Sequence, residues 1–279
     1  MRWPTFAPRS SMGRAKDIVV KPIAAKDANA LVKRLHYSGK VDTRSQLHLG
    51  VFMGDKCGGV MQFGPSVNKH ASRNMFKDAK WNEWIELHRM AFADWLPRNS
   101  ESRAIGYALR WMRKMYTHIS FVVSYSDGAQ CGDGTIYRAS GFVLTDIKKN
   151  TSMWRMPDGE VVCSIVFNPG FGGQNSQGKN NIKAKYGKTG SGASTSFLRG
   201  IGARQLTGFQ LRYIYFLDPT ARKRLTVPIL PFSEIEKRGA GMYRGKAKTS
   251  AGSSPVEQPA SSGEVGGSIP TPALKVTEA

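Results

Sequence analysis

The sequence has little cysteine, few acidic residues and no long hydrophobic run. Its three cysteines show no C-x-x-C spacing and are odd in number, so they predict neither a disulfide framework nor a standard zinc motif. It contains no run of the roughly 18 apolar residues that a membrane-spanning helix needs, and no apolar segment of a secretion signal. These absences argue against secreted and membrane-spanning classes, and we expect a protein of the reducing cytoplasm.

The shortage of acidic residues leaves the chain strongly positive. Lys and Arg number 41 against 20 Asp and Glu, which gives a formal net charge of +21 at pH 7. Basic and acidic residues balance from Lys246 onward, so the whole excess lies before that residue. A charge of this size exceeds what solubility requires and predicts an anionic partner, with nucleic acid as the first candidate.

Length and composition favour one globular domain with appendages. With 279 residues and 40% hydrophobic content, the chain can bury one full core. We expect a flexible arm over residues 1–17, a catalytic domain over 18–244 and a disordered tail over 245–279, which is rich in Ser, Pro, Gly and Glu. Within the domain, residues 168–206 carry many Gly, Ser and Asn and no acidic residue, which indicates a flexible basic insertion between two paired strands.

Hydrophobic periodicity predicts an α/β fold: a central mixed, twisted sheet with flanking helices. Helical spacing indicates one helix ending near His36 and a second one capped by Ser100 or Ser102. Because strand 84–92, this second helix and strand 119–125 follow one another, we expect a right-handed parallel crossover. The remaining elements are a strand at 18–23, a hairpin at 47–53 and 56–63, a short helix at 135–140, and strands at 142–144, 161–167 and 209–217.

The start of the second helix carries an R-x-x-G-x-A pattern. Free backbone N–H groups at a helix N-terminus attract anions, so this turn can hold a pyrophosphate. An ordinary helix start explains the pattern equally well. The residues concerned are Arg103, Ala104, Gly106 and Ala108.

Four further polar residues could take part in catalysis. His36 and Tyr37 end the first helix, where the histidine could carry a proton or stabilise the helix terminus. Asp127 follows a buried strand at its carboxyl end, where open α/β sheets bind ligands, although it could also be a turn residue before Gly128. Tyr137 lies ten residues later and could instead be a packed aromatic.

The order of these elements resembles the GNAT (acyltransferase-like) fold, with its coenzyme A loop at the R-x-x-G-x-A turn. Within it, the chain resembles the phage Mom family over roughly residues 18–232. The segments that carry the second resemblance are residues 35–39, 59–64, 86–90, 99–106, 124–128, 135–142, 211–216 and 222–228.

The resemblance to the Mom family implies a function. Members convert the N6 amine of adenine in duplex phage DNA to a carbamoylmethylated form, which protects the genome from host restriction. It also implies acetyl-CoA or a related acyl donor, although acetyl transfer alone cannot form the alkyl bond of the product. A bound iron is implied as well, with His36 and Asp127 as candidate ligands. The functional residues that it implies are His36, Tyr37, Ser102, Asp127 and Tyr137.

A physical account of these roles begins with the base. Adenine N6 is paired within the duplex, so the enzyme must extract the base and help to remove a proton. We place Asp127 near the amine and Tyr137 near the donor. Phosphate contacts are expected from the basic insertion and from a later basic run, namely Lys179, Lys183, Lys185, Lys188, Arg199, Arg204, Arg222, Lys223 and Arg224.

Two other functions stay open. The first is a conventional N-acetyltransferase that acts on a protein or small-molecule amine, with Glu86 or His88 aiding deprotonation. The second is a DNA-binding protein that keeps the scaffold without activity. The charge suits this second function, but the polar cluster at the strand ends does not.

Overall fold

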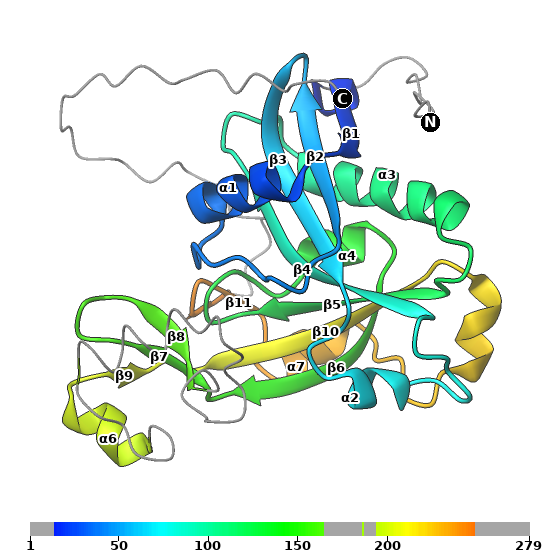
Figure 1. The fold of residues 1–279 in the computed structure, drawn as a ribbon. Helices are drawn as coiled ribbons and strands as arrows, with labels where there is room; N and C mark the ends of the chain where they lie inside the picture. The colour runs from blue at the N-terminus through cyan, green and yellow to red at the C-terminus, as the bar shows by residue number, and fades with distance from the viewer. Residues whose placement is uncertain (1–13, 165–185, 187–193, 249–279) are drawn as a thin grey trace. The chain divides into compact units, whose positions relative to one another are not determined.

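A seven-stranded mixed sheet forms the centre of the computed structural model, which describes residues 14–164, 186 and 194–248 (Figure 1). The strand order is β1-β2-β3-β4-β5-β10-β6, and only β4 and β5 run parallel. The structure therefore confirms the mixed α/β class. The strands are β1 (Ile18–Pro22), β2 (Leu47–Met53), β3 (Lys56–Gly64), β4 (Trp84–Phe92), β5 (Phe121–Asp127), β6 (Val143–Asn150) and β10 (Gly208–Phe216).

Helices cover both faces of this sheet. The apolar stripe of α1 buries Ala28, Leu31 and Val32 against Val60 and Ala91. The helix ends at His36, as the spacing predicts. The other helical elements are η1 (Arg14–Asp17), α2 (Lys69–Arg73), α3 (Ser100–Met115), α4 (Thr135–Ala139), η3 (Pro219–Arg224) and α7 (Ser233–Lys237). No helix of the described residues is long and apolar enough to cross a membrane.

Strands β4 and β5 separate halfway along their length. Their parallel pairing runs only from Trp84 with Phe121 to Leu87 with Ser124. Beyond Leu87, β4 continues beside β3 and β5 continues beside β10. A register shift in the β3–β4 pairing, where His88 is the extra residue, accompanies the separation. The helix α3 makes the predicted crossover between the two strands.

The core lies on both sides of the sheet. On one side, α3 buries Ile105, Leu109 and Met112. On the other side, the segment after α2 packs Phe76 onto Phe121 with ring centroids 3.6 Å apart. Side chains therefore pack against both faces of the sheet in the part where β4 and β5 are still paired.

The structure corrects two sequence predictions about local pairing. Neither serine caps α3, because Asn99 takes the N-cap position in a left-handed conformation and Ser100 is already helical. The described part of the strand predicted at 161–167, namely Val161–Cys163, pairs with Met153–Arg155 and not with the strand at 209–217. Instead, β10 lies between β5 and β6, and this pairing of distant segments is invisible to local periodicity.

A small separate sheet, of order β8-β7-β9, forms beside this core. It has its own buried cluster that includes Trp154, Met156 and Leu198. The described end of the predicted flexible insertion belongs to it, as a helix and a strand. Its elements are β7 (Met153–Arg155), β8 (Val161–Cys163), α6 (Thr195–Gly200) and β9 (Arg204–Gln205).

The boundaries of the domain also differ in detail. Residues 14–17 of the predicted arm form η1, and residues 245–248 of the predicted tail complete a hairpin of β11 (Met242–Tyr243) and β12 (Lys246–Ala247). Residues 1–13 and 249–279 lie outside the described residues.

We predict that the central strand β10 is sensitive to truncation of its side chains. Leu211 is fully buried, so Leu211→Ala should lower the free energy of unfolding by about 2–5 kcal/mol. Ile229 is 38% exposed, so Ile229→Ala should change it by less than about 0.5 kcal/mol. Urea denaturation followed by circular dichroism measures both, and equal effects would contradict the assigned core.

Candidate active site

Three of the predicted residues gather where β4 and β5 part. The phenol of Tyr37, on the loop after α1, is influenced electrostatically by Asp127 at the end of β5 and by Tyr137 on α4. Cys131 and Arg89 influence the same phenol, and neither was singled out by the sequence patterns. Tyr37 is 54% exposed, yet desolvation by the surrounding protein is the largest cause that raises its pKa.

The loop after α1 bridges the gap between the strands. Its Lys40 carbonyl accepts a hydrogen bond from Arg89 Nε at 2.9 Å, and its Ser45 Oγ lies 2.9 Å from His88 Nδ1. Both partners belong to the part of β4 that has left β5. This loop is therefore held by β4, and it places Tyr37 near Asp127 at the end of β5.

Asp127 is a carboxylate with raised basicity. Burial raises its pKa, while the backbone N–H of Ala129, at 2.9 Å from Oδ1, and the side chains of Asn150 and Gln130 partly oppose this effect. The hydrogen bond to Ala129 is the turn interaction that the sequence left open, so Asp127 is both a turn residue and a member of the cluster. A carboxylate with raised pKa accepts a proton more readily than an ordinary aspartate.

Tyr137 is a buried phenol that stays protonated. It is 8% exposed and packs at ring-centroid distances of 5.4 Å from Phe142 and 5.3 Å from Tyr213. Burial raises its pKa to about 12, and the nearby Ser124 hydroxyl slightly opposes the shift. Ser124 Oγ is fully buried and makes no hydrogen bond of good geometry. Tyr137 is thus both a packed aromatic and a proton-bearing neighbour of the site.

His36 is a weak base here. Burial and then the charge of Arg89 lower its pKa to about 4. Its Nδ1 lies 2.8 Å from Ser38 Oγ, and its ring lies 4.1 Å from that of Tyr37. A neutral imidazole of such low basicity suits hydrogen bonding and stacking, and Asp127 is the better proton acceptor.

Arg89 and Cys131 escaped prediction because their positions depend on distant pairing. Arg89 follows the extra residue His88 in β4, and it is this register shift that sets its direction. Cys131 lies on the loop after β5, with Sγ 3.1 Å from the carbonyl of Asp127. The only local signals were a basic residue in an apolar strand and a cysteine four residues after Asp127.

Ser102 lies apart from the cluster. Its hydroxyl faces the carbonyl of Asn99 at 3.3 Å, and its own carbonyl lies 3.5 Å from Ser140 Oγ after α4. The structure therefore places Ser102 at the contact between α3 and α4. Its predicted role rests on the family resemblance alone.

The predicted pyrophosphate turn is part of a helix. Because α3 begins at Ser100, the predicted turn starts inside the helix, where Ser100 N–H bonds Pro97 O and Arg103 N–H bonds Asn99 O. Ala104 and Ala108 are buried in the core and cannot touch a ligand. This placement corrects the predicted turn, because the interior N–H groups of a helix are satisfied within it.

An acyl donor fits this helix start in part. The buried Nε of Arg103 has no hydrogen-bond partner, and a Cβ at Gly106 would meet only Arg110 Nη1, at 3.4 Å. The unpartnered Nε of Arg103 suits an anionic group, and Gly106 adds little bulk to the second turn of α3. Glu101 in the same turn opposes an anion.

The described residues do not fit a metal site. No three His, Cys, Asp or Glu side chains in the described ranges converge as ligands. His36 and Asp127 therefore lack a third ligand of these types among those residues. Iron, which the resemblance implied, finds no support from their arrangement.

The predicted phosphate contacts fall into three groups. Lys179, Lys183, Lys185 and Lys188 lie outside the described residues. Arg199, Arg204, Arg222 and Lys223 are exposed, the first two on the small sheet and its helix. Arg224 instead forms an ion pair with Glu83, which lowers the pKa of that carboxyl and engages its own guanidinium.

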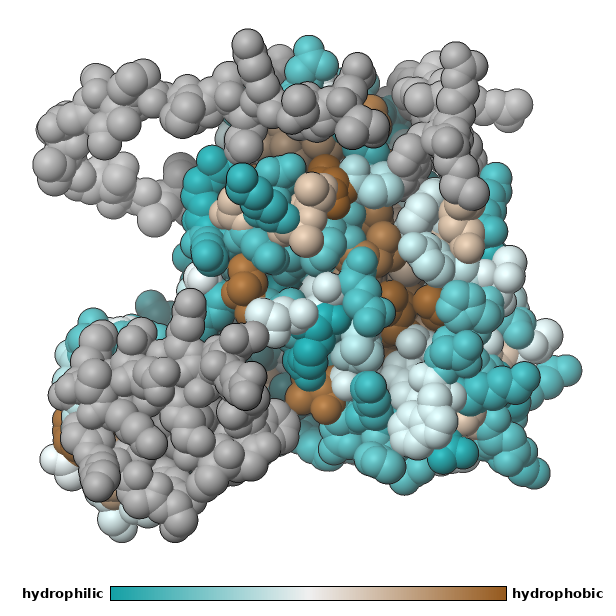
Figure 2. Space-filling model, viewed as in Figure 1, coloured by the Kyte–Doolittle hydropathy of each residue, from teal (hydrophilic) through white to brown (hydrophobic). Residues whose placement is uncertain are grey.

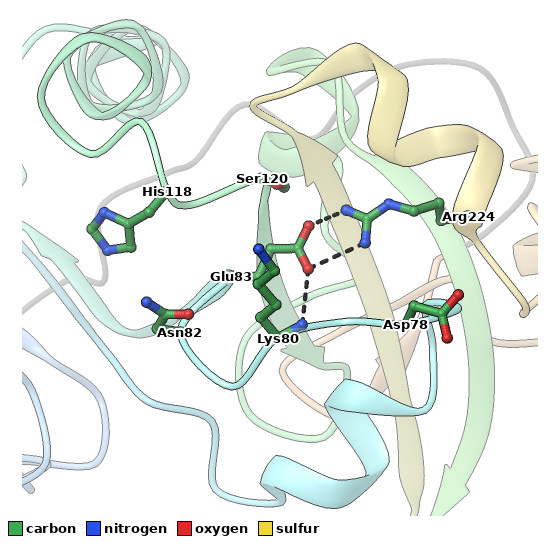
Figure 3. A pocket seen from close by; sticks show the side chains of 7 residues that line it. All are labelled: Asp78, Lys80, Asn82, Glu83, His118, Ser120 and Arg224. Carbon is green, nitrogen blue, oxygen red and sulfur yellow. Dashed lines mark hydrogen bonds and ion pairs between the residues drawn. The ribbon is translucent and has the colours of Figure 1, made fainter.

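The Arg224–Glu83 pair borders a hollow at the opposite ends of the strands (Figure 3). Glu83 precedes β4 and Ser120 precedes β5, so this hollow lies at their amino ends. Figure 3 shows the Glu83 carboxylate held by both Arg224 and the backbone of Lys80. Since Glu83 and Arg224 pair with each other, we assign this pair a structural role.

Glu86 and His88 are engaged within the protein. Burial raises the pKa of Glu86, whose carboxylate accepts from Val67 N–H at 3.3 Å. His88 lies between Ser45 and the carbonyl of Pro65, at 2.9 and 3.0 Å. These contacts stabilise the sheet beside the gap, and we assign neither residue to a second catalytic centre.

Comparison with known proteins adds independent information. The model of the Mom protein family matches residues 17–234. Methylcarbamoylase mom of Escherichia phage Mu is 34% identical over 226 residues, which are 80% of this chain and 85% of that protein.

Solved structures resemble the chain at lower sequence identity. The ribosomal-protein-S18-alanine N-acetyltransferase from Escherichia coli is 10% identical with a TM-score of 0.39, over 72% of this chain and 94% of the other. An acetyltransferase from Bacillus subtilis in complex with CoA is 9% identical with a TM-score of 0.37, over 71% and 97%.

We predict that His36 makes stability depend on pH. Its folded pKa of about 4 lies below its ordinary value of 6.5, so its contribution is complete above 6.5 and is lost as pH falls towards 4. In His36→Gln, the loss of unfolding free energy across this window should shrink by about 1–2 kcal/mol. Urea denaturation at several pH values measures it, and identical slopes for both proteins would refute the low pKa.

Proposed function

The chain belongs to the Mom protein family and is a transferase, and we propose on that basis that it transfers a carbamoylmethyl group to adenine N6 in duplex DNA. The modified base would protect phage DNA from restriction in the host cytoplasm. The observation that carries the proposal is that Tyr37 lies close enough to Asp127 and Tyr137, where β4 and β5 part, for both to act electrostatically on its phenol.

Asp127 accepts the proton from the N6 amine in this proposal. Forming the new N6–C bond requires loss of one N6 hydrogen, and the lone pair of that amine is delocalised into the ring. The raised pKa of Asp127 supports this role, because burial makes the carboxylate a stronger base. The bond from Ala129 N–H to Oδ1 holds the carboxylate in a fixed orientation.

The two tyrosines bind and orient the reactants, Tyr37 the adenine base and Tyr137 the donor. Tyr37 is half exposed beside Asp127, so its ring can stack on a base turned out of the duplex. Tyr137 keeps its proton at neutral pH and can donate a hydrogen bond to the donor group. His36 supports Tyr37 through ring contact.

A bound acyl donor would supply carbon to the modification, while the alkyl bond to N6 and the amide nitrogen of the product require a further co-reactant. We propose that the first turn of α3 and Arg103 hold the phosphates of the acyl donor. The unpartnered Nε of Arg103 supports this assignment.

DNA would lie across the face shown in Figure 2, where hydrophilic residues surround hydrophobic patches on the described surface. Lys40, on the loop that carries Tyr37, forms an ion pair with Glu160 between β7 and β8, so the small sheet adjoins the cluster. Arg199 and Arg204 project from that sheet and its helix and can neutralise phosphates.

The first test is nucleoside mass spectrometry of plasmid DNA from cells that express the chain. We expect carbamoylmethylated adenine with the wild type, at least about 100-fold less with Asp127→Asn and about tenfold less with Tyr137→Phe. Ile229→Ala is the matched control and should retain full activity. Unmodified adenine with wild-type protein, or an N-acetylated product, would overturn the proposal.

The second test is the salt dependence of DNA binding. Arg199→Gln with Arg204→Gln should reduce the slope of log K against log salt concentration by about 1.8, since each lost phosphate contact removes about 0.9. Arg224→Gln should lower the melting temperature and leave the slope unchanged, because Arg224 is paired with Glu83. A fluorescence anisotropy titration at several salt concentrations decides, and an unchanged slope in the double variant would place the phosphate contacts elsewhere.

A further inference from the structure

The loop between Asp127 and α4 depends on a distant part of the chain. Residues 128–133 join the two candidate site residues Asp127 and Tyr137, and they carry Cys131. Arg244 N–H bonds Cys131 O at 3.0 Å, and Gly245 N–H bonds Gly128 O at 2.9 Å. Gly132 forms a bridge with Tyr243. The loop therefore takes much of its backbone hydrogen bonding from the hairpin of β11 and β12.

The hairpin itself is anchored. Ile235 on α7 is buried in the main core, and Ala240 N–H bonds Ile235 O at 2.7 Å. Met242 is buried against the loop, where a Cβ placed on Gly128 would meet the Met242 Cβ at 3.1 Å. The close fit leaves little room for a side chain at position 128.

A buried carboxylate, that of Asp133, links the hairpin to the start of α4. Asp133 is 4% exposed, and its Oδ2 accepts from Lys248 Nζ at 2.9 Å. Its Oδ1 accepts from Thr135 Oγ1 at 2.8 Å and faces Arg138 at 3.5 Å. Because a buried carboxylate needs compensating partners, Lys248 ties the end of the hairpin to the start of α4, the helix that carries Tyr137.

We propose that residues 242–248, which we call the latch, hold the loop 128–133 so that Asp127 and Tyr137 keep their relative position for catalysis. Lys248 is a positioning residue, since it acts through Asp133 and touches neither candidate site residue. The match to the Mom family model ends at residue 234, so the latch lies outside it. The catalytic part of this inference rests on the proposed function, while the mechanical part stands alone.

Cys131 reports the state of the latch. Burial raises the pKa of its thiol, and burial likewise raises the pKa of the Cys57 thiol on β3. Both thiols are therefore protonated, half-buried and slow to alkylate in the closed protein. Cys131 is bonded to the latch through its carbonyl, whereas Cys57 lies on β3, so Cys57 is an internal reference in the same molecule.

The test compares Lys248→Met with Lys246→Met in the full chain. Iodoacetamide labelling followed by peptide mass spectrometry should show Cys131 alkylation about fivefold faster in Lys248→Met, because local opening becomes more populated. Cys57 should keep its rate, Lys246→Met should match the wild type, and Lys248→Arg should restore protection. DNA modification should fall in Lys248→Met with no more than a small change in DNA affinity.

Each other outcome counts against a stated part. Equal Cys131 rates in wild type and Lys248→Met, or an equal rise in Lys246→Met, would overturn the latch. Faster labelling with undiminished DNA modification would overturn its positioning role. If wild-type protein modifies no DNA, the proposed function fails, and the labelling still decides whether the latch exists.

Discussion

The separation of β4 and β5 is the constraint on which the candidate site depends. A parallel pair that continued to its end would fill the gap with backbone hydrogen bonds and leave no room for side chains. Here the pairing stops at Leu87 and Ser124, and each strand continues with another neighbour. The opening can persist because both strands remain hydrogen-bonded on their outer sides, so few backbone groups are left without partners.

Burial in this opening acts in opposite directions on the two candidate proton carriers. It raises the pKa of Asp127 and lowers that of His36, because desolvation disfavours the charged form of each. The positive charge of Arg89 lowers the pKa of His36 further. One environment therefore produces a more basic carboxylate beside a weakly basic imidazole, which assigns proton transfer to the carboxylate and leaves hydrogen bonding and stacking to the histidine and tyrosines.

Sequence patterns predicted the elements well and their long-range pairing poorly. The run at 84–92 and the hairpin at 47–63 follow from local periodicity, and β4 has those bounds. The insertion of β10 between β5 and β6 pairs residues that lie from 58 positions (Gly208 and Asn150) to 95 positions (Phe216 and Phe121) apart in the sequence, and no local signal specifies it. Tyr37, Asp127 and Tyr137 were found through family resemblance and through strand ends. Arg89 was missed because a register shift sets its direction.

The basic charge and the latch illustrate two ways in which composition misleads about local structure. Arg224 lies in a basic run, yet a buried carboxylate partner gives it a structural role. Residues 245–248 have the composition of a tail, yet their backbone and Lys248 close the loop beside the site. In both places one buried acidic residue, Glu83 or Asp133, decides the outcome, because leaving that charge unpaired would cost more than ordering one basic side chain. In a chain with so few acidic residues, the buried ones therefore indicate which basic residues are structural, and the exposed remainder are those available to an anionic partner.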